Sequence, residues 1–203
     1  MKKNAIKSPA KRGRPRAFKE ADVLARATDA FLEHGYSGAS LETLTTAMGI
    51  NKPSLYATFG DKRALFVRVV EEAIAERGRR FRSAFDRGDT LETSLREMFL
   101  EAIDVYFDAA SSPGCLMVSG ATTEAVVDEG LAELTRAFFA LSDRVLASWI
   151  ARRAPERAGA RSAVLGRLVN GIIHDLALRS RVGESRAKLR EHARDAASAL
   201  SRC

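Results

Sequence analysis

Residues 34–66 read HGYSGASLETLTTAMGINKPSLYATFGDKRALF, and this stretch carries the start and stop signals of two short helices. Apolar residues at helical spacing predict a first helix that ends at Gly35, and Ser40 is a good N-cap for a helix that ends at Gly49. Asn51 is the N-cap of a second short helix, and Asp61 caps a longer one that follows it. Two short helices joined by a glycine-containing turn are typical of a helix-turn-helix.

Several spaced features of this stretch resemble the DNA-binding domain of TetR/AcrR-family transcriptional regulators. The first features are the pair Gly35-Tyr36 and the spaced residues Thr43, Ala47, Gly49 and Ile50. They are followed by a Ser-Leu-Tyr motif at Ser54 to Tyr56 and by a Phe-Gly-Asp-Lys-x-x-Leu-Phe segment at Phe59 to Phe66. The similarity extends roughly from Phe18 to Val70. It implies a three-helix DNA-binding domain over residues 19–66 and a helical effector-binding and dimerisation domain over residues 67–203.

The remaining sequence supports an all-α protein of about nine helices. Apolar residues recur at helical spacing from residue 65 to residue 200, with Gly and Pro between the segments, and no strand pattern or internal repeat occurs. The expected helices include a short sixth one over residues 115–127. The resemblance to TetR/AcrR regulators is weaker in this part of the chain, where it is limited to the number of helices and a Pro-Gly-Cys-Leu-Met-Val segment.

The family resemblance and the physics of groove recognition together suggest which residues contact DNA. A major groove admits one α-helix, which reads base edges with residues near its N-terminus. The candidates on that helix are Lys52, Pro53, Ser54, Tyr56 and Thr58. Of these, Lys52, Ser54 and Tyr56 are expected to contact base edges or the adjoining backbone, whereas Leu55 and Phe59 are expected to pack in the core. Helix packing is the alternative role for the Tyr56 ring.

Further contacts are expected with phosphates. Lys62 and Lys52 can neutralise phosphate charge. Ser40 and Thr43 stand at a helix N-terminus, whose free backbone N–H groups favour an anion.

The net charge of +7 is concentrated in an N-terminal arm, residues 1–18. Residues 1–20 contain eight Lys or Arg and one Glu, and the remaining residues have equal numbers of acids and bases. Within the arm, Arg12-Gly13-Arg14-Pro15-Arg16 resembles the core of an AT-hook, so Arg12, Arg14 and Arg16 are candidate minor-groove contacts. A solubility tail or an expression remnant is the alternative. Residues 21–68 have five acids and five bases, so the arm is expected to supply much of the non-specific affinity for DNA.

The distribution of aromatic residues suggests where an effector binds. Eight of the 14 aromatic residues lie between Phe81 and Trp149, and none lies after Trp149. An apolar effector pocket is therefore expected to be lined by Phe99, Ile103, Tyr106, Phe107, Met117, Phe138, Trp149 and His174. Plain core packing is the alternative for each of these residues.

The last two helices offer aliphatic ridges suited to close packing. The family resemblance implies that they pair with their copies in a homodimer, through Leu165, Leu168, Val169, Ile172, Leu176, Ala193, Ala196, Ala197 and Leu200. An intramolecular role for the same stripes is the alternative.

Composition excludes several other classes of protein. The longest uncharged run has 15 residues and is too short to span a bilayer, so no membrane association is expected. Cys115 and Cys203 cannot form a disulfide framework, which fits the cytoplasm. The three His are scattered and no metal or phosphate motif occurs, so we expect neither an enzyme nor a cofactor or metal. The resemblance to TetR/AcrR regulators implies a homodimeric repressor that binds double-stranded DNA at a pseudo-palindromic operator and is released by a small apolar effector. The alternative is a helical module that binds a small molecule or a protein and keeps a vestigial helix-turn-helix.

Overall fold

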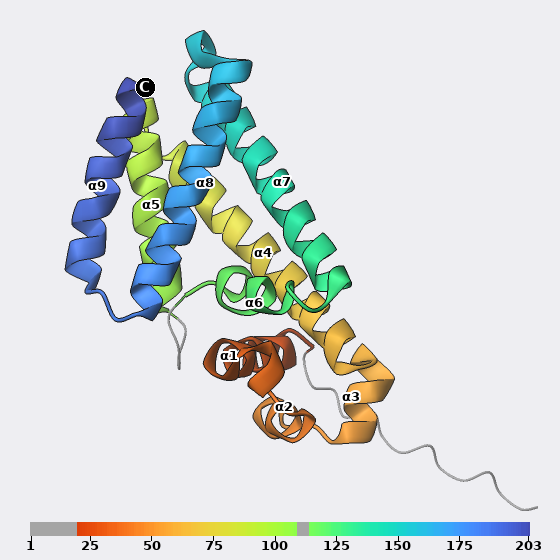
Figure 1. Cartoon of the computed structure of the whole chain (residues 1–203). Coiled ribbons are helices and arrows are strands. Elements are labelled where there is room, and N and C mark those ends of the chain that lie inside the picture. Colours follow the sequence, from red (N-terminus) through yellow and green to blue (C-terminus); the bar gives the residue numbers. More distant parts are fainter. Residues whose placement is uncertain (1–19, 109–113) are drawn as a thin grey trace, which may run out of the picture.

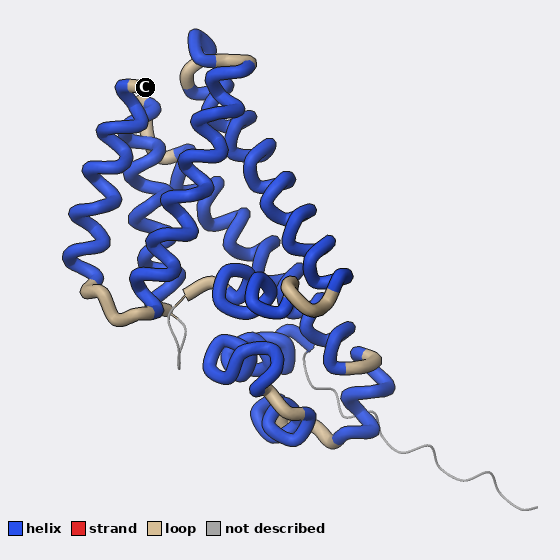
Figure 2. The backbone as a smooth tube through the Cα atoms, viewed as in Figure 1, coloured by secondary structure: helices blue, strands red, loops and turns tan. Residues whose placement is uncertain are grey.

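The computed structural model describes residues 20–108 and 114–203. All regular structure within these ranges is helical, which confirms the predicted all-α class (Figure 2). In chain order the elements are α1 (Glu20–Gly38), α2 (Leu41–Met48), α3 (Lys52–Phe59), α4 (Lys62–Asp86), α5 (Leu91–Phe107), η1 (Met117–Ala121), α6 (Thr122–Glu124), α7 (Glu129–Arg153), η2 (Pro155–Arg157), α8 (Ala160–Arg181) and α9 (Arg186–Arg202).

The helix starts around the helix-turn-helix lie where the sequence predicts them. The backbone N–H of Thr43 donates to the Ser40 side chain at 3.0 Å, which caps α2. Asn51 caps α3 in the same way, and Asp61 caps α4. These side chains satisfy N–H groups that have no partner within their own helices. Gly49 ends α2 in the left-handed region at φ 67°, where a side chain would be strained.

Two segments differ from the sequence prediction. Gly35, expected to end the first helix, instead forms a kink within α1 at φ 71° and ψ 174°. The expected helix over residues 115–127 is a π-helical turn, η1, followed by the three-residue α6. The Cα of Gly120 lies so close to the Phe66 ring that an added Cβ would be 3.5 Å from it, so this turn packs directly on α4.

The helices form two parts that share α4 (Figure 1). Helices α1 to α3 lie at one end of the molecule, and α5, α7, α8 and α9 form the larger bundle. An aromatic cluster joins α1 to α4, with the Phe31 and Phe66 ring centroids 5.0 Å apart and those of Tyr36 and Phe66 4.9 Å apart. Since α4 continues without a break through residue 66, the helix that packs against α1 also enters the bundle.

Close packing of α7 against α8 depends on Gly166. A Cβ at this position would lie 2.8 Å from the carbonyl oxygen of Asp143 and 2.9 Å from the amide nitrogen of Ala147. Both are backbone atoms of α7, so the helices would have to move apart.

Replacing Gly166 with alanine is therefore expected to lower the free energy of unfolding by about 1–3 kcal/mol, the usual cost of overpacking a core. Gly78→Ala in α4 is the matched control, because no atom lies within 4 Å of the Cβ that it would add. Alanine is the better helix former, so this control is expected to gain up to about 1 kcal/mol. Urea unfolding of the two variants measures both effects. Equal changes in the two variants would contradict the tight approach of α7 and α8.

No helix in residues 20–108 or 114–203 combines the length and the apolar character needed to cross a membrane.

Candidate functional site

Helix α3 separates buried anchors from an exposed side. Leu55 is fully buried and Phe59 is 8% exposed, so these two residues hold the short helix onto its neighbours, as the sequence predicts. On the other side Tyr56 is 51% exposed, an unusually large value for an aromatic residue within a folded domain. The alternative of a packed Tyr56 ring does not fit this exposure.

The other candidates on α3 also reach the surface. Lys52, Pro53 and Thr58 are exposed, whereas Ser54 is half-buried and gives its backbone N–H to the Asn51 cap at 2.9 Å. Lys52 and Tyr56 are four residues apart and therefore lie on one face of the helix. On this face the charged Lys52 suits a phosphate, and the amphipathic Tyr56 ring suits a base or a sugar.

The predicted phosphate contacts at the start of α2, Ser40 and Thr43, already form hydrogen bonds with each other as part of the N-cap. Ser40 is exposed and Thr43 half-buried, and their hydroxyl oxygens are 2.8 Å apart. The Ser40 oxygen also accepts the backbone N–H of Thr43. Whichever hydroxyl accepts the bond between the two side chains keeps its own O–H, which can donate to a phosphate oxygen.

Lys62, which the sequence predicts as a phosphate contact, makes contacts within the chain. Its ammonium group donates to the carbonyl oxygen of Ser37 at 3.4 Å and lies 4.7 Å from the centroid of the Tyr36 ring. Partial burial lowers the pKa of Lys62, while Glu124 acts in the opposite direction. Lys62 therefore helps to hold α4 against the end of α1. The predicted contacts Arg12, Arg14 and Arg16 lie outside the described residues.

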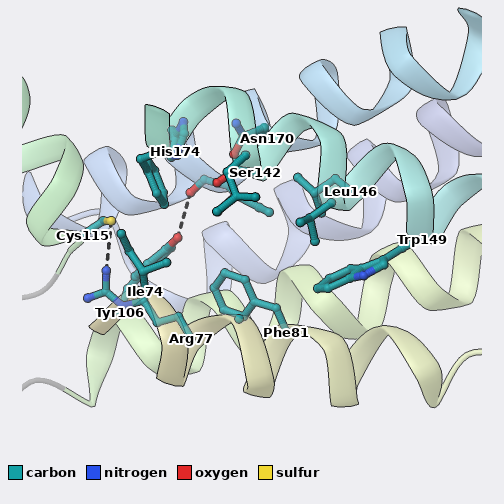
Figure 3. A pocket seen from close by; sticks show the side chains of 15 residues that line it. Ile74, Arg77, Phe81, Tyr106, Cys115, Ser142, Leu146, Trp149, Asn170 and His174 are labelled. Atoms are coloured by element: carbon teal, nitrogen blue, oxygen red, sulfur yellow. Dashed lines mark hydrogen bonds between the residues drawn. The ribbon is translucent and has the colours of Figure 1, made fainter. Parts of the chain in front are cut away.

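A cavity of about 160 Å³ lies within the larger bundle, between α4, α5, α7 and α8. Its apolar walls include Phe81, Leu146 and Trp149 at one end (Figure 3). Arg77, Cys115, Tyr106 and His174 are grouped at the other end. The cavity is thus amphipathic along its length.

Of the eight predicted pocket residues, Tyr106, Phe138, Trp149 and His174 line this cavity. The other four do not. Phe99, Ile103 and Met117 are buried in the core, and Phe107 packs under Arg186, whose guanidinium carbon is 4.9 Å from the ring centroid. Sequence reasoning missed Arg77, Phe81, Ser142 and Leu146 as pocket residues, because helical periodicity does not reveal which turn of a helix borders a void.

Most polar groups of the cavity have partners inside the chain. The Tyr106 hydroxyl donates to the carbonyl oxygen of Ile173 at 3.2 Å, and burial raises the pKa of this tyrosine. The Asn170 amide donates to Asp143 at 2.7 Å. Burial lowers the pKa of His174 to about 4, although Asp143 opposes the shift, so the imidazole is neutral at pH 7.

The outer face of α8 carries exposed aliphatic residues. Val164, Leu168 and Leu178 are each nearly half exposed, and Val182, the C-cap residue directly after α8, is 82% exposed. We call this row the α8 stripe. Partly buried Ile172 and Ala196 lie beside it, where α9 borders α8. Isolated exposed apolar residues are common, whereas a row along one helix marks an interaction surface.

The nine predicted dimer residues divide into two groups. Leu168, Ile172 and Ala196 reach this surface. The other six are packed inside the protomer itself, namely Leu165, Val169, Leu176, Ala193, Ala197 and Leu200. Burial of these six fits the alternative of an intramolecular role, because they make apolar contacts within one chain.

The segment that leads away from the cavity contacts helices α1 and α4. Arg63 forms an ion pair with Asp128 at 3.2 Å, and Ser37 donates to Glu124 at 2.7 Å. Cys115 lines the cavity at the start of the same segment. Residues 114–128 therefore run from the cavity wall to the end of α1 and the start of α4.

The chain matches the family model described as "Bacterial regulatory proteins, tetR family" over residues 23–69. It is 27% identical to the HTH-type transcriptional repressor ComR of Escherichia coli K12, over 88% of this chain and 87% of ComR. It is 31% identical to the HTH-type transcriptional regulator YezE of Bacillus subtilis 168, over 59% of this chain and 62% of YezE. Among solved structures, a cysteine mutant of the TetR-family regulator CifR bound to 26-bp double-strand operator DNA has a TM-score of 0.82 and 29% identity. That match covers 92% of this chain and 99% of CifR.

Proposed function

Because this chain belongs to the TetR family of transcriptional regulators, we propose that it is a cytoplasmic repressor that binds operator DNA as a homodimer. The observation that carries the proposal is the exposed face of α3, where Lys52 and half-exposed Tyr56 stand beside each other above buried Leu55 and Phe59. A relative of this chain is named a repressor, and a structural neighbour holds operator DNA.

In the proposed complex α3 lies in the major groove. Lys52, Ser54 and Tyr56 contact base edges or the adjoining backbone, with Pro53 and Thr58 beside them. The N-terminus of α2, with Ser40 and Thr43, binds a phosphate, and Lys62 adds positive charge near the backbone. The arm with Arg12, Arg14 and Arg16 follows the minor groove.

We propose that the dimer forms through the α8 stripe together with Ile172 and Ala196. A twofold axis beside α8 brings the same surface of both chains together. The two copies of α3 then face successive major grooves, about 34–36 Å apart, and the operator is pseudo-palindromic.

A small effector in the cavity is proposed to release the DNA. It would contact Cys115 and α4, which both lead to the DNA-binding part, through residues 114–128 and through the helix itself. The unbroken series of contacts along residues 114–128 and along α4 supports this connection between the cavity and the DNA-binding helices. For the DNA to be released, the effector must bind more tightly to the conformation that cannot bind DNA than to the one that can.

Leu168→Arg tests the dimer and the DNA activity together. Like charges meeting across an apolar twofold interface cost several kcal/mol, so we expect monomers at micromolar concentration and operator binding weakened by at least about tenfold. Ala75→Arg adds the same charge at an exposed position of α4 and should leave both properties unchanged. Light scattering and gel-shift assays on DNA upstream of the chain's own gene give the readouts. A dimeric, fully active Leu168→Arg variant would contradict the proposed interface.

A further inference from the structure

Helix α4 contains six arginines, and five of them form ion pairs with carboxylates. Arg63 pairs with Asp128 and Arg68 with Glu20, while Arg79, Arg80 and Arg82 pair with Glu76, Glu101 and Asp86 respectively. Arg77 is the exception among the described residues. Residues 1–19 and 109–113 contain no Asp or Glu, so the sequence leaves no other carboxylate for it.

Arg77 is also the arginine that lines the cavity (Figure 3). Its Nη1 donates to the Cys115 sulfur at 3.0 Å, and its Nη2 lies 3.4 Å from the carbonyl oxygen of Gly114. Neither of these partners is a carboxylate, and a guanidinium stays protonated in proteins. The group also has five N–H donors, so several remain for a ligand.

The other lining residues add no second charge. His174 is neutral at pH 7, and Tyr106 and Asn170 are hydrogen-bonded to the protein. Asp143 accepts a hydrogen bond from Asn170 and is not part of the lining. A ligand therefore meets one cation at one end and aromatic and aliphatic side chains at the other.

The volume of the cavity limits the size of the ligand. The cavity of about 160 Å³ is close to an engineered apolar cavity of about 150 Å³ that binds benzene. A single ring or a short branched chain fits this space, with its polar group toward Arg77 and its apolar body toward Trp149.

We propose that the effector is a small monocarboxylate with a one-ring or short-chain apolar body, and that Arg77 selects it by binding the carboxylate. This inference rests on the proposed function, in which the cavity is the effector site. A guanidinium matches a carboxylate with two parallel N–H···O bonds, which gives both affinity and selection against neutral analogues.

Benzoate and its neutral counterpart benzyl alcohol test the assignment by calorimetry on the full chain. Wild-type protein should bind benzoate at least about tenfold more tightly than benzyl alcohol, the effect of one charge-assisted hydrogen-bonded pair. Arg77→Met should abolish this preference and leave benzyl alcohol binding within about twofold. Arg77→Lys should retain part of the preference, because it keeps the charge and loses the planar fork. Arg79→Met, two residues away and outside the cavity lining, is the matched control and should behave as wild type.

Several results would overturn the assignment: equal binding of the two ligands by wild-type protein, a preference that survives in Arg77→Met, or no binding of either ligand. A purely structural role of Arg77 would lower the melting temperature without changing the preference.

Gel shifts without ligand, on the same preparations, separate this inference from the proposed function. Operator binding by wild-type protein together with absent benzoate selectivity defeats the inference alone. Selective benzoate binding without DNA binding defeats the proposed function and leaves the ligand assignment standing.

Discussion

Replacing Tyr56 with alanine is expected to weaken operator binding by about a hundredfold or more. A hydrogen bond to a charged group such as a phosphate contributes about 1.5–3 kcal/mol, and a dimer loses it twice. Because Tyr56 is half exposed, the free energy of unfolding should change by less than about 1 kcal/mol. Gel shifts and urea unfolding measure the two quantities.

Two further variants make this result interpretable. Tyr56→Phe keeps the ring and removes the hydroxyl, so it separates the contribution of the hydrogen bond from that of the apolar body. Val126→Ala, at an 86% exposed position outside α3, controls for loss of a surface apolar residue. Unchanged DNA binding by Tyr56→Ala would show that this face of α3 does not touch the operator.

Deleting residues 2–16 is expected to produce the second large loss of affinity. The deletion removes seven Lys or Arg, whereas residues 21–68 have no net charge. If Arg12, Arg14 and Arg16 each neutralise one phosphate, the slope of log affinity against log salt becomes shallower by about 2.7 per protomer. The full-length control replaces the same seven bases with glutamine, which keeps the length of the arm. A salt slope identical to that of wild type would remove the arm from the DNA contacts.

Local signals explain why the helix-turn-helix is predictable from sequence. Caps such as Ser40 and Asn51 act on backbone groups only three residues away, so their effect does not depend on the rest of the fold. Leu55 and Tyr56 are adjacent yet differ completely in burial, and the family motif already separates their roles. The predicted sixth helix lacks such a local signal. Its π-helical turn η1 has no side-chain cap, and it packs with Gly120 against Phe66, which is far away in the sequence.

The cavity and the outer faces depend on three-dimensional contacts that periodicity does not encode. Phe99 and Ile103 belong to the apolar side of α5, but that side fills the core instead of bordering the void. Likewise, the regular stripe with Leu165 and Leu176 identifies the most buried side of α8, which faces the protomer's own core. Arg77 stands in an arginine-rich run that reads as a solvated helix face, and only the packed bundle distinguishes it from Arg79.

Methylation protection across the operator decides whether two copies of α3 occupy the major groove. Dimethyl sulfate modifies guanine at N7, an atom that lies in the major groove. Bound wild-type protein should protect guanines in two clusters on one face of the duplex, about 10 base pairs apart or a multiple of that spacing, and Tyr56→Ala should lose both clusters together. Tight operator binding with every guanine N7 still reactive, or with a single protected cluster, would rule out reading of the major groove by a dimer through α3.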